Sequence, residues 1–282
     1  MLSFFWKNKK NFLFFFLGLS SYLFLFIFIK SNFTNQKKEN YFNLNPKNIN
    51  NSRWVGNKVI DKSVSILILA GHADSQGMDG AGTSGEAVSI KGLQPMNRNM
   101  TDELFWNIRI SKAIVKLGKE KGLDINFYDP KIRTIIDPND QKTNWSVGAN
   151  HAKKGVYVLE IHFDSYGKYG IGSGLIPPIS KNVNNIDESL AKTFGKYPLF
   201  FRGGLGAPRR QIRILELAKL EGDLEQNLRN IFTRKQTIKE ISTKVVDSIL
   251  FGLNNKNRFS QQPGKDYIFL PSLHPSATLE AL

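Results

Sequence analysis

The sequence predicts an α/β fold: a single three-layer domain with a twisted, mostly parallel sheet flanked by helices, preceded by an N-terminal transmembrane helix. Three observations predict it. Short β-branched apolar runs are typical of strands buried on both faces, as in parallel sheets. Segments of helical period lie between and after them, and this alternation favours helices layered on a sheet. Before the domain, residues 12–29 form an uncharged apolar segment.

Residues 12–29 (FLFFFLGLSSYLFLFIFI) contain only uncharged residues, mainly Phe and Leu, and have basic residues on both sides. A helix rising about 1.5 Å per residue would span roughly 27 Å here, enough for the hydrocarbon core of a bilayer. A cleavable signal peptide is the alternative, but the apolar run is longer than usual and no small-x-small cleavage site follows. We therefore expect residues 1–30 to be a single-pass anchor in the cell membrane.

Residues 31–62 are rich in Asn and Lys and show no sustained hydrophobic period, so we expect a flexible basic linker. Residues 1–62 contain ten Lys and Arg against two Asp and Glu, and the resulting charge of +8 is more than half of the chain's net charge of +15. This excess lies beside the predicted membrane segment. The charge is therefore explained without nucleic acid as a partner.

The main domain is expected over residues 63–254 and begins with a strand at residues 64–70 (VSILILA). A polar, Gly-rich loop over about residues 71–100 follows. The remaining expected strands are residues 124–128, 156–163 and 212–217, and the expected later helices are residues 186–194, 223–232 and 237–253. The Pro-containing tail, residues 255–282, is expected to be irregular.

A long helix is expected to begin after Thr101, which is a suitable N-cap, and to end at Gly118 or Gly122. Its apolar stripe includes Trp106, and three residues earlier on the same stripe lies Glu103. Glu103 is therefore expected to face the core from the first turn of the helix. Alternatively, it is a solvated residue that stabilises the helix dipole.

The chain has no cysteine, so any metal site must use His, Asp or Glu. His72, His162 and Glu216 fall at or just beyond the ends of predicted strands. In open α/β sheets, the carboxyl ends of the strands are where sites form. Two imidazoles and a carboxylate can hold a catalytic zinc ion, and a further carboxylate can transfer protons during amide hydrolysis. His72, His162, Glu103 and Glu216 supply that set.

Four segments, taken in order, resemble the zinc-dependent N-acetylmuramoyl-L-alanine amidases of the Amidase_3 type. They are ILAGHADSQGMDGAG, Glu103 followed by LFWNIRISKAIVKLGKEKG, ANHAKKGVYVLEIHFDS, and IRILELAKLEGDLEQNL. The resemblance implies that His72, Glu103 and His162 hold Zn²⁺ and that Glu216 is the catalytic acid and base. It also implies that residues 63–254 form a zinc amidase-like catalytic domain.

The chain departs from the family pattern at Ala73, at Asp164 and at Ala218–Lys219. The long interval between His72 and Glu103 also leaves Glu86 as an alternative third ligand. We prefer Glu103 because it is placed on a rigid helix in the right phase.

The resemblance implies a hydrolase that cleaves the amide bond between N-acetylmuramic acid and L-alanine in peptidoglycan. Its catalytic domain would lie on the extracytoplasmic side of the membrane. Two alternatives remain: a catalytically inactive wall-binding or cell-division protein with the same fold, and a zinc exopeptidase.

Overall fold

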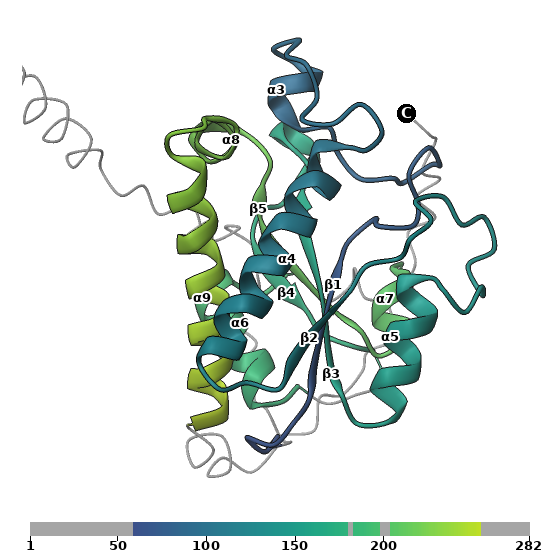
Figure 1. Ribbon diagram of the computed structural model, residues 1–282, viewed down its shortest axis with the longest axis vertical. Coiled ribbons are helices and arrows are strands. Elements are labelled where there is room, and N and C mark those ends of the chain that lie inside the picture. Colours follow the sequence, from purple (N-terminus) through teal and green to yellow (C-terminus); the bar gives the residue numbers. More distant parts are fainter. Residues whose placement is uncertain (1–58, 180–182, 198–203, 255–282) are drawn as a thin grey trace, which may run out of the picture. The chain divides into compact units, whose positions relative to one another are not determined.

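The computed structural model describes residues 59–179, 183–197 and 204–254 (Figure 1). The predicted anchor, most of the predicted linker and the tail at residues 255–282 lie outside the described residues. Within the described ranges, no helix combines the length and the apolar character needed to cross a bilayer. The described chain starts by docking onto the domain, because the Asn185 side chain bonds both the N–H and the carbonyl of Ile60, at 2.7 and 3.2 Å.

Within the described part of the chain, five strands form one sheet, in the order β2-β1-β3-β5-β4. The strands are β1 (Ile66–Ala70), β2 (Ile125–Tyr128), β3 (Tyr157–Asp164), β4 (Gly174–Ile176) and β5 (Arg213–Lys219). The pairs β1–β2, β1–β3 and β3–β5 are parallel, whereas β4 runs antiparallel to β5. The predicted α/β class with a mostly parallel sheet is therefore confirmed.

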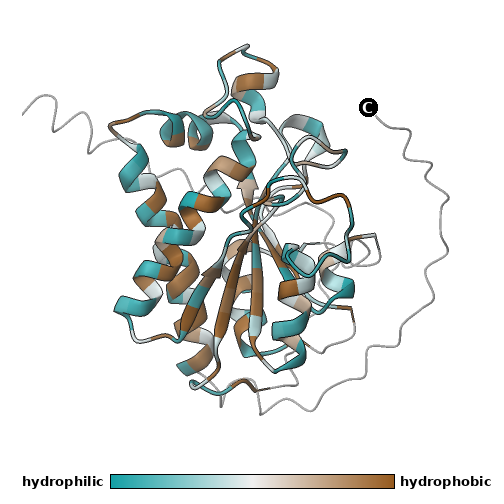
Figure 2. Cartoon of the chain, turned by 45° about the vertical axis from the view of Figure 1, so that its right-hand side comes forward, coloured by the Kyte–Doolittle hydropathy of each residue, from teal (hydrophilic) through white to brown (hydrophobic). Residues whose placement is uncertain are grey.

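Helices cover both faces of this sheet (Figure 1). They are α3 (Gly85–Ser89), α4 (Asp102–Glu120), α5 (Asn144–Lys153), α6 (Asn185–Phe194), α7 (Gly206–Arg209), α8 (Gly222–Arg229) and α9 (Arg234–Asn254), with a 3₁₀ turn at Gly167–Tyr169. One core packs α4, α6 and α9 against the sheet, and a second packs α5 and α7 against the opposite face. Figure 2 shows the result, with hydrophobic central strands between helices whose outer faces are hydrophilic.

Strand β3 shows how the sequence divides between the two cores. Tyr157, Leu159 and Ile161 belong to the core beneath α4, α6 and α9, whereas Val158 belongs to the core beneath α5. Side chains alternate between the faces of a strand. Glu160 and His162, which follow Val158 at steps of two, therefore project from the same face of the sheet as Val158, the face that α5 covers.

Helix α5 was not predicted, because NWSVGANHAK is mostly polar and its apolar side is narrow. Thr143 caps the helix by accepting a hydrogen bond from the Ser146 N–H at 3.0 Å. Gly148 lets the helix lie against the sheet, since a Cβ there would come within 2.6 Å of Ile212 Cδ1. Tertiary packing thus overrides a weak local signal.

Three further differences concern elements that the sequence analysis missed or bounded differently. The expected loop at residues 71–100 contains the short helix α3, which buries Ala87. The sequence predicted Glu216 near the end of a strand at residues 212–217. Strand β5 instead continues to Lys219, so Glu216 lies within the strand. The edge strand β4 was also missed, because a three-residue strand carries too short a pattern to detect.

Candidate metal centre

His72 lies in the turn that directly follows β1, at the carboxyl edge of the sheet. Its φ of +62° lies in the left-handed region, which costs a non-glycine residue about 1–2 kcal/mol. Such strain clusters at functional sites, where the surrounding structure enforces it. Here it turns the His72 side chain back toward the strand ends.

Gly71 explains why a glycine precedes this histidine. A Cβ on Gly71 would lie only 2.3 Å from Cε1 of His162. The imidazole of His162 therefore packs on the bare backbone of Gly71, the residue that follows β1. Any side chain at residue 71 would displace the ring.

Glu103 is buried, with 2% of its surface exposed, in the first turn of α4. The predicted cap Thr101 is confirmed, because its hydroxyl accepts a hydrogen bond from the Leu104 N–H. Two backbone amides fix the Glu103 carboxylate: Thr83 N–H donates to Oε2 at 2.8 Å and Phe163 N–H donates to Oε1 at 3.3 Å. The side chain is therefore held in the core-facing position that the sequence predicted.

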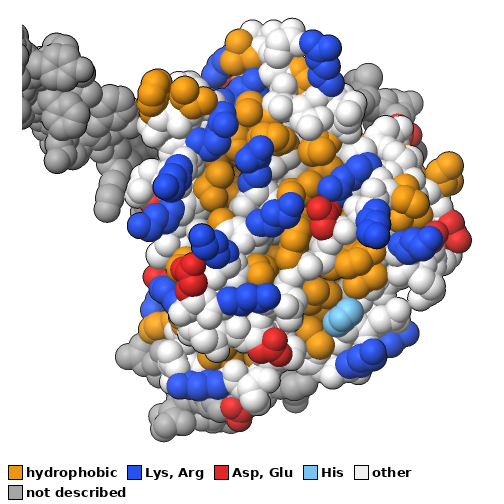
Figure 3. Space-filling view, viewed as in Figure 1, with side chains coloured by type: hydrophobic (Ala, Val, Ile, Leu, Met, Phe, Trp, Pro, Cys, Tyr) orange, Lys and Arg blue, Asp and Glu red, His pale blue; other side chains and the backbone are white. Residues whose placement is uncertain are grey.

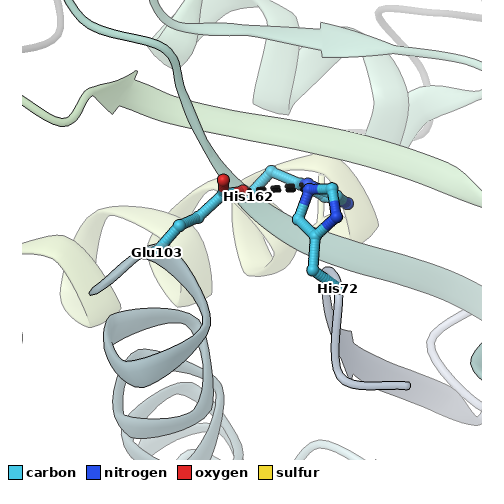
Figure 4. Close-up of side chains that lie close together, drawn as sticks. All are labelled: His72, Glu103 and His162. Atoms are coloured by element: carbon cyan, nitrogen blue, oxygen red, sulfur yellow. Dashed lines mark hydrogen bonds and ion pairs between the residues drawn. The ribbon is translucent and has the colours of Figure 1, made fainter. Parts of the chain in front are cut away.

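His162 completes a group of three side chains that point toward one another from α4, β3 and the turn after β1 (Figure 4). Glu103 Oε1 lies 3.3 Å from His72 Nε2 and 3.2 Å from His162 Nδ1. Ligand atoms of all three residues lie within 4.8 Å of one another. Three residues far apart in the sequence thus offer their ligand atoms to one small volume.

This donor set fits a zinc ion. Zinc takes imidazole nitrogen and carboxylate oxygen at about 2.0–2.2 Å in tetrahedral geometry, which places neighbouring ligand atoms about 3.3 Å apart. The two contacts of Glu103 Oε1 match that spacing. Three protein ligands leave the fourth tetrahedral position for water or substrate.

Glu216 lies next to this group on the neighbouring strand. Its Cα pairs in register with that of His162, and adjacent residues in register on parallel strands share a face. The Glu216 Oε2 atom is buried and has no hydrogen-bond partner among the described residues. The carboxylate is therefore available to a reacting group beside the three ligands.

Electrostatics separate the roles of the two glutamates. Burial alone would raise the pKa of Glu103, but the adjacent His72 and His162 hold it below its ordinary value. Burial raises the pKa of Glu216 well above its ordinary value; His162 opposes this rise, and the carboxylate of Asp164 adds to it. These opposite pKa shifts favour an anionic Glu103, as a metal ligand requires, and a Glu216 that can take up and release a proton, as an acid and base requires.

Glu86, the alternative third ligand, is engaged elsewhere. It lies on α3, where its Oε2 accepts a hydrogen bond from the Gly222 N–H at 2.8 Å and pairs with Lys91 at 3.0 Å. The group that could hold a metal within the described ranges contains Glu103 and not Glu86.

Sequence reasoning missed Glu160, which is buried with 3% of its surface exposed. Its Oε2 lies 3.6 Å from His162 Nε2. The signal was present in the sequence, because Glu160 is a charged residue inside an apolar strand and stands two positions before a candidate ligand.

No family model matches the sequence, and no relative was found among curated proteins. Among solved structures, Cwp6 from Clostridium difficile is similar with a TM-score of 0.45 and 11% identity over 66% of this chain; the match spans only 29% of the Cwp6 chain. The CwlD amidase from Clostridioides difficile, solved in complex with the GerS lipoprotein, has a TM-score of 0.43 and 14% identity, covering 67% of this chain and 98% of that one. The N-acetylmuramoyl-L-alanine amidase AmiC2 of Nostoc punctiforme has a TM-score of 0.41 and 10% identity, covering 67% and 97%.

Proposed function

We propose that this chain is a zinc-dependent hydrolase that cleaves the amide bond between N-acetylmuramic acid and L-alanine in peptidoglycan. The observation that carries the proposal is the convergence of His72, Glu103 and His162, with ligand atoms within 4.8 Å of one another. The Glu216 carboxylate stands beside them on the next strand, and its buried Oε2 has no hydrogen-bond partner among the described residues. The four sequence segments that resemble zinc amidases contain these same residues, and this resemblance supports the choice of bond and polymer.

His72, Glu103 and His162 would hold the zinc ion. When bound, zinc would supply Lewis acidity, which polarises an amide carbonyl and lowers the pKa of a water molecule to about 7. Glu216 would take a proton from the attacking water and return one to the nitrogen of the leaving amine. Its raised pKa suits both transfers, because a catalytic group works best when its pKa approaches the operating pH.

The surface charge is compatible with an anionic wall polymer. Figure 3 shows Lys and Arg side chains spread over the face formed by α4 and α9, with fewer Asp and Glu among them. A basic face of this kind raises the local concentration of a polyanion. The proposal also includes the membrane anchor at residues 1–30, which would place the domain on the extracytoplasmic side, where peptidoglycan lies.

The test uses purified sacculi and the full-length chain. Wild type is expected to release stem peptides with a free L-alanine amino group, and mass spectrometry would identify them. A chelator should stop the release and added zinc should restore it. Glu216→Gln should keep the bound zinc but lose turnover.

The same products separate the alternatives. Zinc binding with cleavage only between amino acids would identify an exopeptidase. Zinc binding with tight adsorption to sacculi but no release would identify an inactive wall-binding protein. A chain that binds no zinc and releases no peptide would contradict the proposal.

A further inference from the structure

The two ring nitrogens of His162 have different surroundings. Nδ1 lies 3.2 Å from Glu103 Oε1, the oxygen that also faces His72. Nε2 points away from that group; it is buried and has no hydrogen-bond partner among the described residues. Burying a ring nitrogen without a hydrogen bond costs folding free energy. The acceptor nearest to Nε2 is therefore a candidate partner.

That acceptor is the carboxylate of Glu160, whose Oε2 lies 3.6 Å from Nε2. Glu160 precedes His162 by two residues on β3, so both side chains leave the same face of the strand. Among the described residues, His162 is the one basic side chain within ion-pair distance of Glu160. The Glu160 carboxylate is therefore the acidic group that stands within reach of the unpartnered Nε2 of His162.

The Glu160 carboxylate also accepts a hydrogen bond from Asn144. Asn144, at the start of α5, directs its side-chain amide to Glu160 Oε1 at 3.4 Å and to the Ala70 carbonyl at 2.6 Å. The Asn144 backbone N–H donates to Asp74 Oδ2 at 2.6 Å. These bonds join the carboxylate to the end of β1 and to α5, so it cannot easily turn away from the imidazole.

We propose that Glu160 is a positioning residue of the metal centre, which accepts the Nε2–H of His162 and so keeps Nδ1 directed at the metal. The 3.6 Å separation needs to shorten by roughly 0.7 Å to reach an ordinary N–H···O distance. A carboxylate behind a ligating histidine fixes the orientation of the ring and makes the other nitrogen a stronger donor to the metal. This inference rests on the proposed function, because it takes His72, Glu103 and His162 as the zinc ligands.

One measurement observes the His162 ring directly. In the zinc-loaded full-length chain, ¹⁵N-edited spectra of the histidine rings should show a proton on Nε2 of His162 and none on Nδ1. His162→Gln, which removes the signal, provides the assignment. A proton on Nδ1 and a metal-bound Nε2 would overturn the proposal.

A second measurement uses Glu160→Gln, which keeps the size of the side chain but removes its charge. Competition with a chelator should show zinc binding about 10- to 100-fold weaker than in wild type. Glu225→Gln is the matched control, since Glu225 is equally buried, at 1% exposure, but lies on α8 outside the group of ligands. This control should bind zinc as wild type does.

The outcomes distinguish the two proposals. Equal zinc affinity in wild type and in Glu160→Gln would overturn the role of Glu160 and leave the proposed function standing. A wild-type chain that binds no zinc would contradict the proposed function itself. Weaker binding in Glu160→Gln alone, together with the expected Nε2 proton, would support the positioning role.

Discussion

Replacing Gly82 with alanine should damage the metal centre although residue 82 is not a ligand. A Cβ at this position would lie 2.8 Å from Glu103 Oε2 and 2.9 Å from His72 Cδ2. Ordinary carbon contacts begin near 3.4 Å, so both ligands would have to retreat by roughly half an ångström. Disturbances of this kind in the shell around a metal site cost about 10- to 100-fold in affinity.

The substitution also has a backbone cost that must be separated from the effect on the metal. Gly82 has a φ of +95°, and a non-glycine residue with positive φ loses about 1–2 kcal/mol of folding stability. Gly80→Ala is the matched control, because Gly80 has a φ of +76° in the same loop but no atom within 4 Å of its Cβ position. Both variants should therefore be less stable than wild type, and only Gly82→Ala should also bind zinc more weakly.

Two assays on the full-length chain separate these effects. Urea unfolding of the zinc-free protein reports the backbone cost in both variants. Competition with a chelator reports zinc affinity. If Gly82→Ala and Gly80→Ala bound zinc equally tightly, the close approach of Gly82 to His72 and Glu103 would be refuted.

Two other predictions concern stability. Asp187→Ala should cost about 3–5 kcal/mol in urea unfolding, because Asp187 is fully buried and bonds both Arg213, at 2.8 Å, and the Tyr157 hydroxyl, at 2.8 Å; a loss below about 1 kcal/mol would contradict the importance of this pair. Burial raises the pKa of Glu225, whose carboxyl group accepts a hydrogen bond from the Ala87 N–H, from its ordinary value of 4.5 to about 7. Protonation of Glu225 therefore stabilises the folded state fully at a pH below 4.5, and this stability is lost as the pH rises through 7. Between pH 5 and pH 8 the urea midpoint of wild type should therefore fall more than that of Glu225→Gln, and parallel pH profiles would show that Glu225 is not responsible.

The sheet and its site could be predicted largely because burial leaves a strong pattern in the sequence. Strands β3 and β5 are apolar runs in which a histidine or glutamate stands out, and such a residue needs a partner or a function. Strand β1 is an apolar run that His72 follows two residues later. Helix α4 was predicted for a similar reason, because the spacing from Trp106 places Glu103 on the buried stripe. The approach of His72, Glu103 and His162 follows from these placements.

Other features depend on contacts that no local pattern encodes. Helix α5 forms from polar residues because Gly148 can lie against Ile212, the residue before β5. The position of Glu160 behind His162 depends on Asn144, which comes from that same unpredicted helix. The division of the chain into anchor, linker, domain and tail stays a prediction.

Titration of zinc into the metal-free, full-length chain tests the central claim most directly. We predict one zinc ion bound per wild-type chain, loss of that binding in Glu103→Gln, and unchanged binding in Glu86→Gln. The two variants remove the same chemical group, one from within the histidine pair and one from α3. Absence of zinc binding in wild type, or its loss in Glu86→Gln but not in Glu103→Gln, would contradict the metal centre described above.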